Sequence, residues 1–187
     1  GLIEDLPIKF TAVAADIATE KEHWFQTGPI DQAIRASVSL PLLFTPHTVD
    51  GVQLIDGGIL NPTPIEPTLG DDTDLTIAVD LGGPMVEETI LKPEKAKSSW
   101  QQKMDDFLDS MRFSESKPKD QWDMFYITDQ SFNTMQNAIA RSRMADNPPD
   151  HLIAIPRNKC GTLEFDRSAE MVEYGYRLAE EQLLGNL

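Results

Sequence analysis

The sequence predicts an α/β fold with a mostly parallel central sheet flanked by helices. Runs of small and β-branched residues, which are typical of buried strands, alternate with runs whose apolar residues recur at helical spacing. This alternation favours a parallel sheet, because consecutive parallel strands must be joined by a crossover, usually a helix. The 187 residues, of which 40% are apolar, suffice for a domain with a hydrophobic core.

Four elements are predicted in the first part of the chain. Residues 8–17 form a strand covered on both faces, since small and β-branched residues dominate it, and residues 23–27 form a neighbouring strand. A short helix covers residues 30–37. Residues 46–56 form a hairpin, because Asp50-Gly51 between two apolar runs is a strong signal for a two-residue turn.

The second part of the chain continues the alternation. Residues 75–81 form the clearest buried strand in the sequence, and residues 151–155 form another. Helices are predicted over residues 131–144 and from a cap at Asp166 through Leu184. The side chains expected to face inward are Phe132, Met135 and Ile139 in the first helix, and Val172, Tyr176, Ala179 and Leu183 in the second.

Residues 83–123 differ in character and are predicted to be a variable insertion that could move. Charged and polar residues surround one apolar stripe at helical spacing, formed by Trp100, Met104, Phe107, Leu108 and Met111. This helix over residues 100–111 could pack on the domain's own sheet. It could instead be a flap that contacts lipid near an acyl site, cover apolar surface left bare by absent strands, or pair with a second copy.

The charge balance argues against two kinds of partner. Sixteen basic residues stand among thirty-one acidic ones, for a net charge of −15, which argues against binding nucleic acid or docking electrostatically on anionic membranes. Apolar contact with lipid stays open. Cys160 is the single cysteine, so no internal disulfide can form, which fits a reducing compartment, and no recognisable cysteine-nucleophile signature surrounds it.

A search for catalytic motifs is largely negative. No Gly-x-Ser-x-Gly, Gly-x-x-x-x-Gly-Lys, Gly-x-Gly-x-x-Gly or His-Glu-x-x-His occurs in the sequence. The three histidines are far apart in the sequence, and we interpret them as surface or strand-end residues. The acidic loop at residues 71–74 lacks the spacing of a calcium loop and is interpreted as a solvated turn. We therefore expect no metal and no cofactor.

The strongest candidate is Asp56, which ends an apolar strand and is followed by Gly57 and Gly58. A carboxylate on a stiff element beside a flexible turn is one way to place a catalytic base. The three residues alone equally suit a turn in which the aspartate caps the backbone, because Asp and Gly are common turn residues.

The flanks of Asp56 resemble the patatin-like phospholipase family. In that family an Ala-Ile-Arg-Ala-Ser helix and a Pro-x-Leu-Phe segment lead into a hairpin, an Asp-Gly-Gly or Asp-Gly-Ala turn, and a loop ending in Pro. This chain has Ala33-Ile34-Arg35-Ala36-Ser37, Pro41-Leu42-Leu43-Phe44, Asp56-Gly57-Gly58, Pro62 and Pro64 in that order. Residues 10–17, 135–145, 148–153 and 173–176 are also similar, so the resemblance covers most of the chain except 83–123.

The resemblance implies a partial three-layer patatin-like domain and a lipid or acyl-ester hydrolase with a Ser-Asp dyad. Asp56 would be the base of the dyad, and Gly57 and Gly58 would form its turn. An aspartate at its ordinary pKa is a poor base for a hydroxyl, so burial would have to raise its pKa. Backbone N–H groups of a glycine-rich loop would hold the oxyanion.

In the family the elbow serine and the glycine-rich loop precede this region, and neither occurs here. We therefore expect residues 1–187 to be the C-terminal half of a patatin-like domain that is inactive by itself. Its expected partners are a lipid or acyl-ester substrate and the missing N-terminal half. Self-association is also expected, because absent neighbours would expose sheet edges and apolar faces. The full protein is expected in the cytoplasm or peripherally on a membrane.

Two alternatives stay open at this point. The chain could be a non-catalytic binding or regulatory module that retains the patatin-like fold, or an unrelated α/β domain in which Asp-Gly-Gly is accidental. The coding sequence upstream of Gly1 discriminates between the first alternative and the enzyme. An elbow serine preceded by a glycine-rich loop supports the enzyme, and a start codon near Gly1 supports the module.

Overall fold

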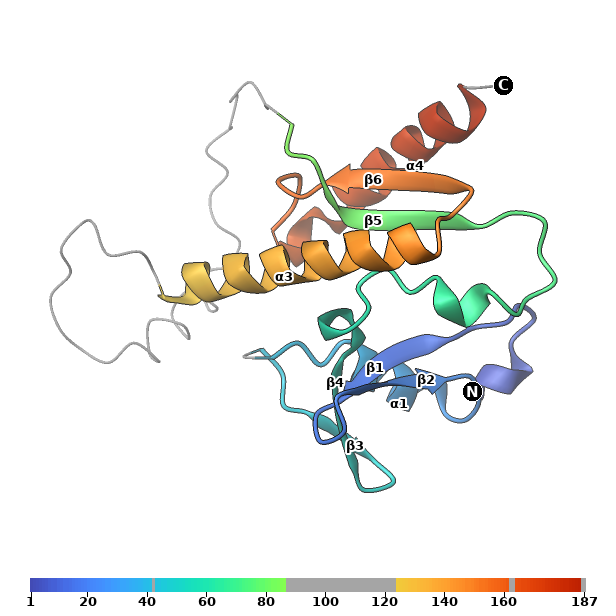
Figure 1. Ribbon diagram of the computed structural model, residues 1–187, viewed down its shortest axis with the longest axis vertical. Helices are drawn as coiled ribbons and strands as arrows, with labels where there is room; N and C mark the ends of the chain where they lie inside the picture. The colour runs from blue at the N-terminus through green and yellow to red at the C-terminus, as the bar shows by residue number, and fades with distance from the viewer. Residues whose placement is uncertain (42, 87–123, 162–163, 186–187) are drawn as a thin grey trace, which may run out of the picture. The chain divides into compact units, whose positions relative to one another are not determined.

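The computed structural model describes residues 1–41, 43–86, 124–161 and 164–185, and the chain divides into two compact units. The first unit comprises residues 1–80 and 129–152, and the second comprises residues 81–128 and 153–187 (Figure 1). The helix predicted over residues 100–111 lies outside the described residues. No helix in the described ranges combines the length and apolar character needed to cross a bilayer.

The larger sheet belongs to the first unit and has the strand order β2-β1-β4-β3 (Figure 1). Its strands are β1 (Ala12–Asp16), β2 (Lys21–Phe25), β3 (His47–Val49) and β4 (Val52–Asp56). All three pairings are antiparallel, which differs from the mostly parallel sheet that the alternation predicts. For two of the three pairings the reason lies in the connections, because β1–β2 and β3–β4 are joined by tight turns and strands joined in this way must run antiparallel.

The predicted hairpin turn is confirmed. Asp50 and Gly51 both have positive φ angles, 49° and 80°, as a type I′ turn requires at its two central positions. Asparagine, aspartate and glycine tolerate this conformation better than other residues. The turn fixes the register of β3 against β4, with Val49 opposite Val52 and His47 opposite Leu54. Asp56 therefore falls at the last position of β4.

Helix α1 (Ile30–Ser37) has the predicted bounds and packs on this sheet. Ala33 and Ala36 are fully buried, and these small side chains let the helix approach the strands closely. The core cluster around them comprises Ile3, Ala12, Ala14, Phe25 and Leu54 in addition to the two alanines. This core cluster thus includes Leu54 of β4, the strand that carries Asp56.

The second sheet consists of β5 (Ile77–Gly83) and β6 (His151–Pro156). The His151 N–H donates to the Thr76 carbonyl and the Arg157 N–H to the Gly83 carbonyl, so both strands advance in the same direction and pair in parallel. The α/β class is confirmed. The expected burial of β5 is wrong, because Val79 is 53% exposed and Leu81 is 71% exposed.

The two long helices are α3 (Met124–Asp146) and α4 (Ser168–Leu184). Helix α3 is longer than predicted, and α4 begins later than predicted. Met135 is exposed, so α3 does not turn the predicted stripe inward as a whole. In α4 the expected inward positions Val172 and Tyr176 are 73% and 68% exposed, and Ala179 and Leu183 are partly buried. Asp166 belongs to a short 3-10 helix, η4 (Phe165–Arg167), and does not cap α4.

Candidate active site

Asp56 lies at the end of β4 and caps the next turn. Its backbone N–H donates to the Ser39 carbonyl at 3.0 Å, and its Oδ1 accepts from the Gly58 N–H at 2.7 Å. That second bond caps η2 (Gly57–Ile59), a 3-10 helix directly after the strand. Oδ2 accepts no hydrogen bond from any residue that the structure describes. The carboxylate is therefore fixed through one oxygen and leaves the other for a further donor.

Gly57 lets this turn press directly against the central strand β1. A Cβ at Gly57 would lie 2.2 Å from the Val13 carbonyl oxygen, which is backbone and cannot move aside. Gly58 differs, because its Cβ would meet the end of the Gln136 side chain at 2.7 Å and Asp56 Oδ1 at 2.9 Å. Glycine is thus needed at position 57 for close approach, whereas the contacts at position 58 are with side-chain ends.

Arg35 and Ser39 support the backbone of Asp56 from the other side. Ser39 is fully buried, and its hydroxyl donates to the Arg35 carbonyl at 2.7 Å and accepts from the Arg35 guanidinium. Arg35 also donates to the Thr45 carbonyl at 3.2 Å and lies 5.5 Å from the Phe44 ring centroid. Sequence reasoning did not assign a role to Arg35 or Ser39. The sequence feature that could have indicated a role for them is their position in the segment that resembles the patatin-like family.

Burial raises the pKa of the Asp56 carboxyl above its usual value, and the hydrogen bond from the Gly58 N–H opposes that rise. Removal from water disfavours the charged form of a carboxyl group. A carboxylate with a raised pKa accepts a proton from a hydroxyl more readily than an ordinary aspartate does. The site therefore has the electrostatic property that a catalytic base needs.

A cluster of charged side chains ties α3 to the segment after Asp56. Arg143 on α3 donates to Glu22 at 2.7 Å, to Glu66 at 3.0 Å and to the Leu60 carbonyl at 3.3 Å. Asn61 is buried and donates to the same two carboxylates, at 3.2 and 2.9 Å. Burial would raise the pKa of Glu66, but hydrogen bonds from Asn61 and Arg143 outweigh it and hold that pKa below its usual value.

This charged cluster was not foreseen from the sequence. Its members are far apart along the chain, with Arg143 separated from Glu22 by 121 positions and from Glu66 by 77. A carboxylate or an arginine on an element gives no sign of a partner at such a distance. The cluster holds α3 at the Leu60 end of the Asp56 turn, while Ser39 holds the Asp56 end.

The other candidates from the sequence do not assemble a site. Cys160 lies in the second unit, where burial and then the Glu164 carboxylate raise the pKa of its thiol, which weakens it as a nucleophile. His23 packs against the Phe25 ring, with centroids 4.4 Å apart. Among the described residues, no group of three or more metal-binding side chains comes together.

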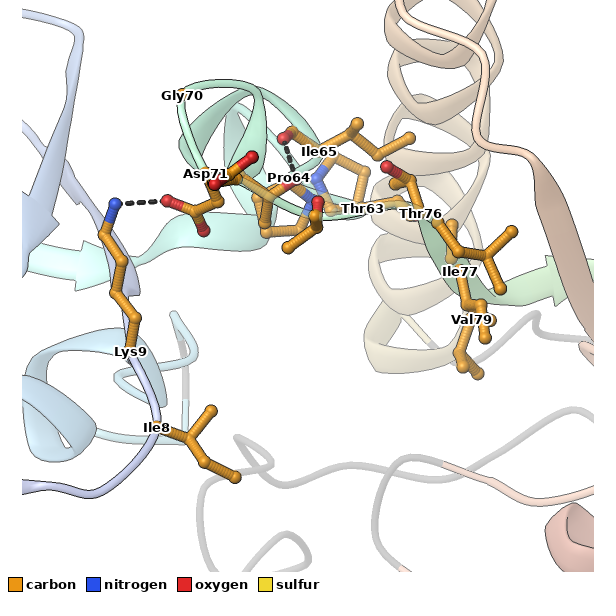
Figure 2. A pocket seen from close by; sticks show the side chains of 16 residues that line it. Ile8, Lys9, Thr63, Pro64, Ile65, Gly70, Asp71, Thr76, Ile77 and Val79 are labelled. Carbon is orange, nitrogen blue, oxygen red and sulfur yellow. Dashed lines mark hydrogen bonds and ion pairs between the residues drawn. The ribbon is translucent and has the colours of Figure 1, made fainter.

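An open groove of about 810 Å³ lies elsewhere in the first unit (Figure 2). It is lined by residues before β1, by the segment after Asn61 and by the first part of β5, including Ile8, Pro64, Ile65, Ile77 and Val79. An ion pair between Lys9 and Asp71 crosses one side of it. The groove therefore combines exposed apolar side chains with a charged margin.

The fold and the site together define a class of protein. The chain is an α/β protein with a strand-end carboxylate of raised pKa, held by backbone groups over a double-glycine turn. The family profile described as patatin-like phospholipase matches residues 3–69, which include this whole turn. The chain belongs to the patatin-like phospholipase family.

Relatives of known name support this assignment. An uncharacterized NTE family protein of Mycobacterium tuberculosis is 32% identical over 231 residues, covering 97% of this chain and 64% of its own length. A second NTE family protein, from Mycobacterium bovis, is 39% identical over 80 residues, 43% of this chain and 14% of its own length. Lysophospholipase NTE1 of Cryptococcus neoformans is 28% identical over 97% of this chain and 11% of its own length. The chain thus spans less than two thirds of these relatives.

Proposed function

We propose that this chain supplies the general base of a serine-type lipid acyl hydrolase, with Asp56 as the aspartate of a Ser-Asp dyad. Asp56 would accept the proton of a serine hydroxyl as that oxygen attacks the carbonyl carbon of an acyl ester. Asp56 would pass this proton to the departing oxygen, so that the C–O bond breaks and the alcohol leaves. It would then take a proton from the water that attacks the acyl-enzyme and return it to the serine oxygen as the acid is released. Membership of the patatin-like phospholipase family and the name of the fungal lysophospholipase support this class of substrate.

One observation carries the proposal. Asp56 has a raised pKa, one oxygen held by the Gly58 N–H and a second oxygen that no described residue uses. A turn cap alone requires only the first oxygen. The second is available to a hydroxyl, and a hydrogen bond of 2.6–3.2 Å to that hydroxyl is the geometry that proton transfer needs.

The nucleophile must come from outside this sequence, because Gly-x-Ser-x-Gly does not occur in it. We propose that a preceding segment of a longer protein carries the serine and the glycine-rich oxyanion loop. The apolar groove beside β5 is a surface on which such a segment could pack (Figure 2). The chain by itself would then have no esterase activity, since nucleophile and oxyanion donors each contribute orders of magnitude to the rate.

Ester hydrolysis by the chain and by a longer product of the same gene tests the proposal. The purified chain should neither hydrolyse a short-chain nitrophenyl ester nor react with a fluorophosphonate probe. A product that includes the upstream elbow serine should do both. In that product Asp56→Asn should lower kcat by roughly 10²–10⁴, the range for loss of a general base. Asp50→Asn is the matched control, because asparagine also suits the positive φ at the hairpin turn.

Two results would contradict the proposal. Turnover by the isolated chain that Asp56→Asn abolishes would show that the nucleophile lies within these residues. Undiminished activity of the longer product carrying Asp56→Asn would remove Asp56 from the reaction. If no elbow serine precedes Gly1 in the gene, the alternative function gains support, namely a binding or regulatory module that retains this fold.

A further inference from the structure

Helix α3 turns a face that carries both apolar and polar side chains toward the rest of the first unit. A helix on the surface of a globular protein normally buries an apolar stripe. The covered positions of α3 combine two kinds of side chain. The apolar ones include Phe132, Ile139 and the buried Ala140, and the polar ones are Asp129, Asn133, Gln136 and Arg143. Polar groups removed from water cost free energy unless they form hydrogen bonds, so each of these polar side chains is expected to have a partner.

Several polar side chains on this face have partners within the first unit. Asn133 donates to Asp129 at 3.1 Å, and Arg143 joins the carboxylates of Glu22 and Glu66. Gln136 lies on the same face, and its partly buried amide makes no hydrogen bond with any described residue. A glutamine amide can donate twice and accept twice.

The Gln136 amide lies beside the Asp56 carboxylate. The point where a Cβ of Gly58 would lie is 2.7 Å from Gln136 Nε2 and 2.9 Å from Asp56 Oδ1. The two atoms are therefore at most 5.6 Å apart, the sum of those distances. Gly58 contributes no side chain, so the amide and the carboxylate face one small space.

The position of Gln136 is fixed by the charged cluster further along α3. Arg143 stands seven residues, close to two helical turns, after Gln136 and on the same face of the helix. Its bonds to Glu22, Glu66 and the Leu60 carbonyl hold that face against the segment that includes the Asp56 turn. The amide thus reaches the turn on a rigid element, which is how a binding group is held in a defined place.

The chemistry of an amide suits a place beside a base. A lysine or arginine there would attract the Asp56 charge, lower the pKa of its carboxyl and weaken it as a base. A second carboxylate would repel a nucleophile that carries developing negative charge. Glutamine donates a hydrogen bond without a net charge, so it can bind an oxygen of a substrate and leave the proton affinity of Asp56 high.

We infer that Gln136 is a substrate-binding residue of the Asp56 site, whose amide N–H donates to an oxygen of the acyl-ester substrate. The inference rests on the proposed function and adds to it a residue on a different element. The structure thereby gives the site two walls, the double-glycine turn with the carboxylate and the covered face of α3 with the amide. Gln136 binds and orients, and Asp56 moves the proton.

The first test asks whether residue 136 and Asp56 interact, and it uses this chain. A carbon-13 NMR titration of the Asp56 carboxyl is measured in the wild type, Gln136→Glu and Gln130→Glu. A second negative charge at position 136 should raise the pKa of Asp56 further, since like charges disfavour ionisation. Gln130→Glu is the matched control, because Gln130 is an exposed glutamine on the same helix. Equal Asp56 titration in all three proteins would overturn the inference.

The second test measures ester hydrolysis by the longer product that carries the elbow serine. Gln136→Ala should lower kcat/KM about tenfold, the loss expected for one hydrogen bond to substrate, chiefly through KM. Gln130→Ala should leave kcat/KM unchanged. If Asp56→Asn abolishes turnover while Gln136→Ala has no effect, the inference fails and the proposed function stands. If Asp56→Asn retains full turnover, the proposed function fails and the inference falls with it.

Discussion

The Asp56 turn and helix α4 are packed in opposite ways, although each contains a glycine at a central position. Gly57 lies against the backbone of β1, where a Cβ would be 2.2 Å from the Val13 oxygen. Gly175, in the middle of α4, has open space around the place of its missing side chain. No residue of α4 is buried, whereas Leu54 just before the turn is fully buried. Tight packing is thus concentrated where the candidate carboxylate is placed.

The largest expected effect is that of Gly57→Ala. The added methyl group must displace the backbone of the central strand, and such overpacking costs about 3 kcal/mol of unfolding free energy. Chemical denaturation followed by circular dichroism measures the loss. Gly58→Ala is the matched control, because the methyl group there meets no backbone, only the ends of the Gln136 and Asp56 side chains, and it should cost less than Gly57→Ala, about 1 kcal/mol. Equal losses in the two variants would contradict this account of the turn.

Arg143→Met should have the next largest effect. It leaves the Glu22 and Glu66 carboxylates partly buried without their cation. Loss of a fully buried partner costs about 3–5 kcal/mol, and because the Arg143 side chain is 35% exposed we expect about 2 kcal/mol at pH 7. Arg177→Met, which removes an exposed pair with Glu173 on α4, should cost less than about 0.5 kcal/mol.

The Arg143 effect should depend on pH. Because hydrogen bonds to Asn61 and Arg143 outweigh burial and lower the folded pKa of Glu66, the stabilisation is present above the ordinary value of 4.5. It is lost as the pH falls through the lowered folded pKa. The stability difference between wild type and Arg143→Met should therefore shrink in acid. A difference that stays constant from pH 7 to pH 3 would mean that Arg143 acts through packing alone.

Gly175→Ala should have the opposite sign to Gly57→Ala. An alanine inside a helix restricts the unfolded chain and favours helical backbone, which stabilises by about 0.5–1 kcal/mol when the methyl group has room. Thermal unfolding of this variant should occur at a higher temperature than in the wild type. Destabilisation would show that α4 packs more closely around Gly175 than the structure indicates.

The smallest effect on the free energy of unfolding is expected from Asp56→Asn, which should increase stability. Because burial raises the folded pKa of Asp56, the native state binds more protons than the unfolded state between 3.8 and the folded pKa. Stability is therefore lost as the pH rises through that window, and the ionised carboxylate is disfavoured above it. Asparagine avoids this cost, so its advantage should appear at pH 7 and vanish below 3.8.

Asp16→Asn serves as the opposite control. Hydrogen bonds from the Thr19 hydroxyl and the Ala18 N–H lower the pKa of Asp16. Its ionised form is therefore stabilised by folding at neutral pH, and substitution by asparagine should destabilise the protein at pH 7 and lose that effect in acid. Asp56→Asn that destabilises at pH 7 like Asp16→Asn would contradict the raised pKa of Asp56.

Local signals in the sequence predicted the first unit well. The Asp50-Gly51 turn, the helix at residues 30–37 and the strand that ends at Asp56 all depend on neighbouring residues, and each is confirmed. The pairing direction of the larger sheet was missed, because alternation of elements says less about direction than the length of the connections does. The catalytic role of Asp56 stays a prediction.

The rest required information that neighbouring residues do not contain. The apolar run of β5 suggested a buried strand, but whether its two faces are covered depends on distant parts of the chain. On α3 the apolar pattern placed Phe132 and Ile139 correctly on the covered side, but Met135 is exposed, and the covered side also carries Gln136 and Arg143, which the pattern did not predict. The spacing of apolar residues cannot predict which polar side chains of a helix will face inward.

The bonds that hold Asp56 are made by main-chain atoms at their far ends, the Ser39 carbonyl and the Gly58 N–H. Every residue except proline carries the donor, and every residue carries the acceptor, so the carboxylate's position is encoded by the path of the backbone. The neighbouring side chains are thereby released to vary with the substrate. A mutational scan should find the glycine at position 57 intolerant and its flanking side chains permissive, so specificity in this site can diverge while the place of the acid stays the same.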